Sequence, residues 1–477
     1  MHAGVSEGEE TVMLEPRQSS LAAIGRDSDI GAANPQATAS YVASDRGRTR
    51  DGPEGITPMW FMTFLLFLIL AALAPWPGAR PAAVVTIAVV LGSALALPYR
   101  FASCAILFGL ISCGQLGKVV FGGTRTTSGT PIPIESVVGV VGLVRWCAWR
   151  PWTWRLRTNA VSFSVLLCLV IDVWVQYRCG TEFSWRPYIG NLVRFVAFVG
   201  TIHVLARAFP EKEVTRALTG IAACLTVMCL AAVVDIQAGL DEFGLDAARG
   251  QSIFGDPNSI ACGCAMAFWI LLFLMSSESR LYAKAAVLLT AVSVILLTAS
   301  RTGTLALAAG ALGMTPGKPA KMICYVLAMA CAMTALSFVL PAAHAQRLKT
   351  IDIAQSRTSV MIEAWQVFLT HPFIGAGRAY WESGKTNARL GAHNSVIHAL
   401  AEGGLLYGVP YTVSLAMPVI WLASARRWRH DTQRMALCVY CVYLVGAMGL
   451  VLVLQHGAQC SFVCYGMLVA VMSRDAA

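Results

Sequence analysis

The residues of this chain that are best suited to chemistry are arginines and one histidine at interruptions of apolar sequence. Arg301 follows Ser300 where two apolar runs meet, and Arg357 opens a stretch with helical periodicity. A guanidinium group binds two phosphate oxygens at once through its planar fork of N–H donors. His393 directly precedes Asn394 and an expected helix start, where a neutral imidazole can accept a proton. This pattern indicates a phosphate-bearing substrate and a general base.

A third arginine, Arg249, precedes the segment GDPN at 255–258. Asn258 stands in the first turn of the apolar run that follows, where a helix dipole also favours an anion. Taken singly, each arginine is typical of a membrane interface, and a lone histidine more often packs or caps a helix than catalyses. Several such residues on one side of a molecule favour a binding site instead.

The sequence offers no pattern for a metal ion. His393 and His398 are five residues apart, about 140° around a helix, so they cannot share a face as a pair of metal ligands does. His398 and Glu402 are four residues apart, and we expect an ordinary hydrogen bond between them on a helix surface. Glu363, Glu382 and Glu402 are scattered rather than clustered. We therefore expect neither a metal nor another cofactor.

The composition places these residues in a membrane protein. Of the 477 residues, 56% are hydrophobic and 13% are charged, whereas a soluble domain carries about 25% charged residues. The mean hydropathy is +0.62. The apolar residues recur in blocks of about 16 to 22, near the length that crosses a bilayer as a helix. These values exclude a soluble enzyme and predict an all-α, polytopic helical membrane protein with about 12–14 transmembrane helices.

The polar segment 1–57 has no apolar run, so we expect a disordered tail that is not cleaved. The spans expected after it are 59–74, 82–97, 101–117, 132–149, 158–177, 188–207, 214–236, 258–276, 284–300, 302–314, 321–340, 407–424, 434–455 and 459–472.

Four of the connections between spans are rich in basic residues, and the positive-inside rule predicts that they face the cytoplasm. They contain Arg145, Arg150, Arg155 and Arg157; Arg280 and Lys284; Lys318 and Lys321; and Arg426, Arg427, Arg429 and Arg434. This topology puts both termini inside and brings 237–257, 300–303 and 341–406 together on the outer face. The segment 1–57 holds five Arg against nine Asp and Glu, so the rest of the chain carries a formal charge of +14. Because topology accounts for most of this excess, the expected partners include membrane lipids and no nucleic acid.

The long segment 341–406 is expected to form a structured cap rather than a disordered loop. Its residues 357–369 have the spacing of an amphipathic helix that lies on the bundle or at the membrane interface, ending at the His371-Pro372 pair. A second helix is expected to begin near Asn394, with Asn394 or Ser395 as its N-cap, and to end at 403–404. The predicted organisation is a tail at 1–57, transmembrane helices at 58–340, an outer catalytic loop at 341–406 and further transmembrane helices at 407–477.

At these residues the sequence resembles the O-antigen ligase and polymerase family of bacterial envelope glycosyltransferases. The matching pieces are FGDPNSIA at 254–261 with the preceding Arg249, SRTG at 300–303, the helix from Arg357 that ends in HPFIGAG, and AHNSVIHALAEGGLLYG at 392–408. The resemblance covers roughly residues 180–470, in the same order as in the family.

The resemblance implies a multi-span enzyme of the bacterial inner membrane, with its active site on the periplasmic side. Its expected partners are an undecaprenyl-diphosphate-linked oligosaccharide and an acceptor glycan or lipid. By position, His393 matches the essential histidine of the family, and Arg249, Arg301 and Arg357 match its functional arginines. The resemblance thus assigns His393, Arg301 and Arg357 to catalysis. Substrate binding is assigned to Arg249, Asn258, Ser300 and Asn394.

Three alternatives remain open at this point. We favour a polymerase of exopolysaccharide or O-antigen repeat units over a ligase that moves a finished glycan to lipid A core or protein, although both use the same donor. A transporter or flippase of a lipid-linked glycan would place charge near the bilayer midplane and would show inverted repeats. The mid-span positions are nearly uncharged, with Asp172 and Arg194 as exceptions, and no repeat is apparent.

Overall fold

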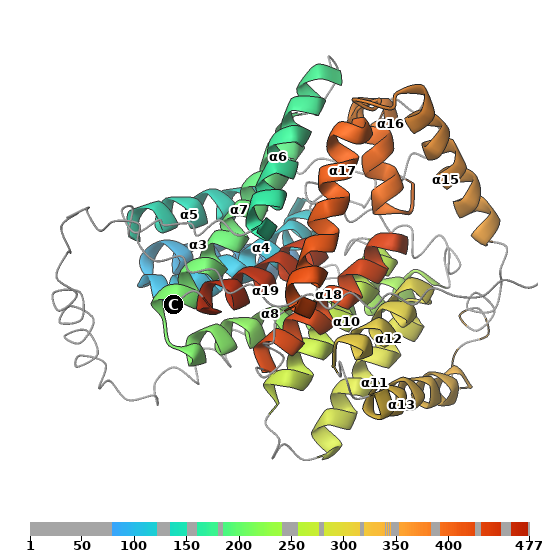
Figure 1. Ribbon diagram of the computed structural model, residues 1–477. Helices are drawn as coiled ribbons and strands as arrows, with labels where there is room; N and C mark the ends of the chain where they lie inside the picture. Colours follow the sequence, from blue (N-terminus) through green and yellow to red (C-terminus); the bar gives the residue numbers. More distant parts are fainter. Residues whose placement is uncertain are drawn as a thin grey trace, which may run out of the picture. The chain divides into compact units, whose positions relative to one another are not determined.

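A computed structural model describes residues 79–121, 134–149, 160–179, 185–240, 256–275, 281–314, 319–338, 340, 342, 344, 353–382, 392–424, 431–449 and 459–475. The tail 1–57 and the expected span 59–74 lie outside these ranges. Within them the regular secondary structure is entirely helical (Figure 1). The prediction of an all-α, polytopic membrane protein is confirmed.

The described helices coincide with the expected apolar blocks. The first six are α3 (Ala79–Ala96), α4 (Tyr99–Phe121), α5 (Ile134–Trp149), α6 (Ala160–Cys179), α7 (Trp185–Ala208) and α8 (Glu211–Ala238). The others are α10 (Pro257–Leu274), α11 (Leu281–Leu297), α12 (Arg301–Met314), α13 (Pro319–Ser337), α15 (Ile353–Thr370), α16 (Arg378–Glu382), α17 (Ser395–Ser424), α18 (Asp431–Gly449) and α19 (Gln459–Asp475). Every expected span from 82–97 onward overlaps one of these helices.

Four of these helices are long and apolar enough to cross a bilayer. They are Tyr188–Ala208, Glu213–Ala238, Pro257–Leu274 and Ser395–Leu422. Shorter apolar helices include Arg80–Ala96 and Lys284–Leu297. The expected short span 302–314 corresponds to α12, whose 14 residues rise roughly 21 Å and so fall short of a hydrocarbon core of about 30 Å.

Helix α12 packs closely against α10 and α18 because small residues line it. The indole N–H of Trp269 on α10 donates a 3.1 Å hydrogen bond to the carbonyl of Leu307 on α12. Gly310, one turn further along α12, lies directly against the same indole, and a Cβ there would overlap it. Close approach through small residues is the usual way in which membrane helices associate. The contact packs the middle of α12 tightly against the C-terminal half of α10.

Helix α17 contains a break that divides it into two segments. Gly404 has φ 60° and ψ −160°, a backbone conformation that is essentially restricted to glycine. A Cβ at Gly404 would overlap the backbone of Phe373, in the turn that joins α15 to α16. The expected helix end at 403–404 is thus a break, and α17 continues through the boundary expected at 406–407. The segment before the break, 395–403, begins next to His393.

Candidate functional site

The N-terminus of α10 is capped by Asp256. Its carboxylate accepts hydrogen bonds from the backbone N–H of Ser259 at 2.9 Å and from the Ser259 hydroxyl at 3.3 Å. The Asn258 side-chain amide donates to the other carboxylate oxygen at 3.5 Å. Pro257 occupies the first helical position, where its lack of an N–H costs nothing. Local sequence therefore determines where this helix begins and how its first turn is held.

The junction of α11 and α12 places Ser300 between two helix ends. Ala299 adopts a left-handed conformation with φ 47°, and the N–H of Ser300 bonds to the carbonyl of Ile295 at 3.2 Å, which closes α11. The Ser300 hydroxyl accepts from the N–H of Gly303 at 3.1 Å, which caps α12, and donates to Asn258 Oδ1 at 2.9 Å. Arg301, the first residue of α12, therefore lies next to the first turn of α10.

The N-terminus of α17 is capped by Asn394. Its side-chain oxygen accepts from the N–H groups of Val396 at 3.0 Å and Ile397 at 3.1 Å. Its amide nitrogen donates to the carbonyl of Met448, near the end of α18, at 3.4 Å. The expected capping by Asn394 or Ser395 is thus confirmed for Asn394.

The end of α18 also lies against the first turn of α12. A Cβ at Gly449 would stand 2.8 Å from the methyl group of Thr302. Since α18 touches both Thr302 and Asn394, the N-terminal ends of α10, α12 and α17 all gather around the end of α18. Helix N-termini carry partial positive charge and favour an anion, while the partial negative charge at the C-terminus of α18 opposes this in part.

Helix α15 has two faces, and Arg357 belongs to the inner one. Ala364, Val367 and Phe368 pack in a buried apolar cluster with Ala392 and Ala401. Arg357 precedes Ala364 by two helical turns and is therefore on the same side of the helix. Figure 1 shows α15, α16 and the first part of α17 next to one another. The inner face thus directs Arg357 toward the start of α17.

His393 and the arginines share one electrostatic environment. Burial lowers the pKa of His393 below its usual value, the charge of Arg357 lowers it further, and the carboxylate of Asp256 opposes both. Burial also lowers the pKa of Arg357, with Asp256 and Arg301 acting in opposite directions. Four groups from α10, α12, α15 and the start of α17 thus act on one another. The lowered pKa favours the neutral form of the His393 imidazole, which can accept a proton.

The backbone at His393 is itself strained. Its φ is 51°, a left-handed conformation that L-residues rarely adopt. Such strain persists only where surrounding contacts fix it, and it is common at functional sites. Here the hydrogen bonds by which Asn394 caps α17 supply such contacts on the C-terminal side of His393.

A comparison with known protein families agrees with the resemblance in the sequence. Residues 265–412 match the family described as O-Antigen ligase. This segment, about a third of the chain, is therefore similar to the O-antigen ligase family. No curated protein matches the chain. The matched segment contains Ser300, Arg301, Arg357, His393 and Asn394. The match supports an enzyme of the ligase or polymerase type that handles lipid-linked glycans in a bacterial membrane.

The structure brings together six of the seven site residues that the resemblance in the sequence implies. Asn258, Ser300, Arg301, Arg357, His393 and Asn394 lie at the gathered helix ends or on the inner face of α15. Arg249 lies outside the described residues. In the described part of the chain, no group of three or more His, Cys, Asp or Glu residues could hold a metal ion.

One expectation about the cap is wrong. His398 and Glu402 do lie 3.3 Å apart, but both side chains are buried rather than on a helix surface. Glu402 also bonds to Gln176 of α6 at 3.0 Å. Helical periodicity reports which residues share a face, not whether a neighbouring helix covers that face. Nothing in the sequence pointed to Gln176 as a partner of Glu402.

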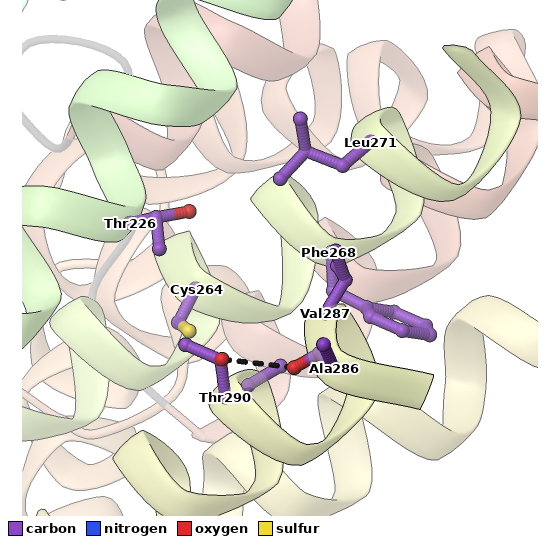
Figure 2. A pocket seen from close by; sticks show the side chains of 8 residues that line it. Thr226, Cys264, Phe268, Leu271, Ala286, Val287 and Thr290 are labelled. Carbon is purple, nitrogen blue, oxygen red and sulfur yellow. Dashed lines mark hydrogen bonds between the residues drawn. The ribbon is translucent and has the colours of Figure 1, made fainter. Parts of the chain in front are cut away.

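An apolar pocket lies elsewhere in the bundle, between α8, α10 and α11 (Figure 2). Its volume is about 170 Å³, and it is lined by Thr226, Cys264, Phe268, Leu271, Ala286, Val287, Thr290 and Ala291. The Thr290 hydroxyl is bonded to the carbonyl of Ala286 at 2.9 Å, so it offers little to a polar ligand. None of the seven expected site residues lines this pocket. The residues that could bind a polar substrate therefore lie at the helix ends rather than in this pocket.

Proposed function

We propose that this protein is a metal-independent glycosyltransferase that moves a glycan from undecaprenyl diphosphate to an acceptor hydroxyl, in polysaccharide polymerisation. The observation that carries the proposal is the neutral, strained His393 within the electrostatic reach of Arg357 and Asp256. A base near fixed cations suits a reaction in which a hydroxyl loses a proton and a diphosphate leaves.

In the proposed reaction, the acceptor oxygen attacks the anomeric carbon of the donor sugar. The bond between that carbon and the diphosphate oxygen breaks, and the electron pair leaves with undecaprenyl diphosphate. The hydroxyl proton passes to a ring nitrogen of His393. Arg301 and Arg357 stabilise the charge that develops on the leaving diphosphate, and Arg249 is assigned to the same anion.

The capping residues act on the substrate through the helix ends that they hold. Ser300 is fully buried and Asn394 is 4% exposed, so neither side chain presents a free surface to a ligand. Their bonds fix the backbone N–H groups of α12 and α17, whose dipoles favour the diphosphate. Asn258, which bonds to Ser300 and is less buried, is better placed to meet the substrate directly.

The test is transfer by the purified protein, reconstituted in lipid, from an undecaprenyl-diphosphate-linked oligosaccharide in the presence of EDTA. Wild type should release undecaprenyl diphosphate, and His393→Ala and Arg301→Ala should lose at least about 100-fold in kcat. Matched controls are His371→Ala, at an exposed histidine, and Arg80→Ala, at an exposed arginine of α3. Both should behave as wild type.

Product length separates the two activities of the family. A ladder of repeat units supports a polymerase, whereas a single transfer to an acceptor lipid or protein indicates a ligase. An inactive wild type, or a His393→Ala variant that matches wild type, would overturn the proposed mechanism. Movement of the intact lipid-linked glycan across the bilayer would then be the activity to measure.

A further inference from the structure

A second polar cluster lies in the described part of the chain, away from the helix ends that hold the arginines. It joins Asp172 and Gln176 on α6, Tyr188 on α7 and Glu402 on α17. Each of these four side chains is at most 2% exposed. The Tyr188 hydroxyl donates to one oxygen of Asp172 at 2.7 Å, and Gln176 donates to the other at 3.0 Å. Buried carboxylates are costly unless donors surround them, so this arrangement requires a structural or functional reason.

Gln176 is the centre of the cluster. Its Nε2 donates to Asp172 Oδ1 and to Glu402 Oε1, each at 3.0 Å, and its Oε1 accepts from the backbone N–H of Arg378 at 3.0 Å. These partners fix the orientation of the amide, because carboxylates can only accept and a backbone N–H can only donate. One side chain therefore ties α6 to both α16 and α17.

The first segment of α17 needs such a tie. The break at Gly404 separates residues 395–403 from the membrane-crossing part of the helix, so the longer part does not determine the direction of the shorter one. Backbone bonds join the break to the turn before α16. They run from Gly377 N–H to Glu402 O at 2.8 Å, from Ala376 to Ala401 at 3.0 Å and from Leu405 to Pro372 at 2.7 Å. The turn and the short segment thus form one unit, which Gln176 holds against α6.

We propose that Gln176 is a positioning residue for the transfer reaction: by holding Glu402 and the start of α16, it fixes the segment 395–403 and thereby His393. The expected effect of Gln176 on the transfer rate rests on the proposed function, whereas its expected effect on the position of α17 does not. It assigns a role to α6, which precedes the matched family segment at 265–412. Misplacing a base by about 1 Å can cost about 100-fold in rate, so a distant tie can control catalysis.

The variant Gln176→Leu removes the amide at similar size. We expect kcat for transfer to fall roughly 10- to 100-fold while KM for the lipid-linked donor stays within about twofold, because the arginines and helix ends remain in place. The matched control is Gln433→Leu, the same change at a buried glutamine of α18, which should leave both constants near wild type. Tyr188→Phe keeps all three bonds of Gln176 and should lose less than about threefold in kcat.

Amide hydrogen exchange provides a readout that does not depend on activity. In Gln176→Leu, exchange should become faster in residues 395–403, with α10 and α12 unchanged. If the leucine variant does not fold, Gln176→Met takes its place with the same expectations. An unchanged kcat, or faster exchange spread over α10 and α12, would overturn the positioning role. If wild type transfers no glycan but Gln176→Leu still speeds exchange only in residues 395–403, the positioning of α17 is supported and the proposed function is refuted.

Discussion

The Ser300 hydroxyl at the start of α12 donates a 2.9 Å hydrogen bond to Asn258 Oδ1 in the first turn of α10. The same hydroxyl oxygen accepts from the N–H of Gly303 and so caps its own helix. One fully buried side chain therefore sets the spacing of two helix ends, and with it the distance from Arg301 to the Asp256 carboxylate.

Replacing Ser300 by alanine should destabilise the protein by about 1–2 kcal/mol, because an N-cap is lost and the oxygen of Asn258 loses a donor. The measurement is the thermal unfolding midpoint in detergent, which should fall by a few degrees. Thr219→Ala removes an exposed hydroxyl that bonds within α8 and should leave the midpoint unchanged. Equal midpoints for Ser300→Ala and wild type would show that this bond contributes nothing to the junction.

The pH dependence of transfer should report the charges around His393. If the neutral imidazole is the base, kcat/KM falls as the pH drops through the pKa of His393, which lies below 6.5 because of burial and Arg357. Arg357→Gln removes a positive charge, so it should raise that pKa and move the acid limb to higher pH. Asp256→Asn removes a negative charge and should move the limb to lower pH.

These opposite displacements are measured by recording kcat/KM as a function of pH between about 4.5 and 8, which is the range in which histidine titrates. Tyr282→Phe, at an exposed residue of α11, provides a control profile that should overlay wild type. Limbs that move in the same direction in both charge variants would show that another group controls the profile.

Gly404 should tolerate no side chain. Gly404→Ala forces alanine into a glycine-only conformation, at a cost of about 1–3 kcal/mol, and overlaps the backbone of Phe373. Because His393 stands at the start of the segment that this break directs, activity should fall together with stability. Both are measured on one preparation, as the melting midpoint and the transfer rate.

Gly92 on α3 provides a control at which the same substitution should stabilise the protein rather than destabilise it. Its Cβ would meet nothing within 4 Å, and α3 is helical throughout, so Gly92→Ala should stabilise by about 0.5–1 kcal/mol. A stable, active Gly404→Ala variant would mean that the break in α17 is not required.

The outer face of α15 should contact lipid. Ile362, Trp365 and Leu369 are exposed on a face that lies about 80–140° around the helix from Arg357, and such an apolar stripe on an amphipathic helix is typical of a membrane interface. Lipids brominated in their acyl chains should quench part of the tryptophan fluorescence of the reconstituted protein. The quenched fraction should be smaller in Trp365→Phe, and the difference between the two proteins reports on this one residue among the 13 tryptophans of the chain. Equal quenching in the two proteins would place this face of α15 in water.

The sequence by itself determined where the helices are. Apolar blocks predict helices because a bilayer offers backbone groups no other hydrogen-bond partner, and every expected span from 82–97 onward overlaps a described helix. Helix ends were also predictable from local chemistry, since Asn394 caps its own helix through the next three residues and α15 stops before the His371-Pro372 pair. The family motifs pointed to the residues that gather at those ends.

Only the tertiary structure decided which helix ends and side chains meet. Ser300 and Asn258 are 42 positions apart, and Gln176 and Glu402 are 226 apart. Periodicity places His398 and Glu402 on one face, but the packing of α6 against α17 is what buries that face. Contacts of this kind depend on how helices cross and which side chains interdigitate there, and these are properties of the assembled bundle rather than of any local stretch of sequence.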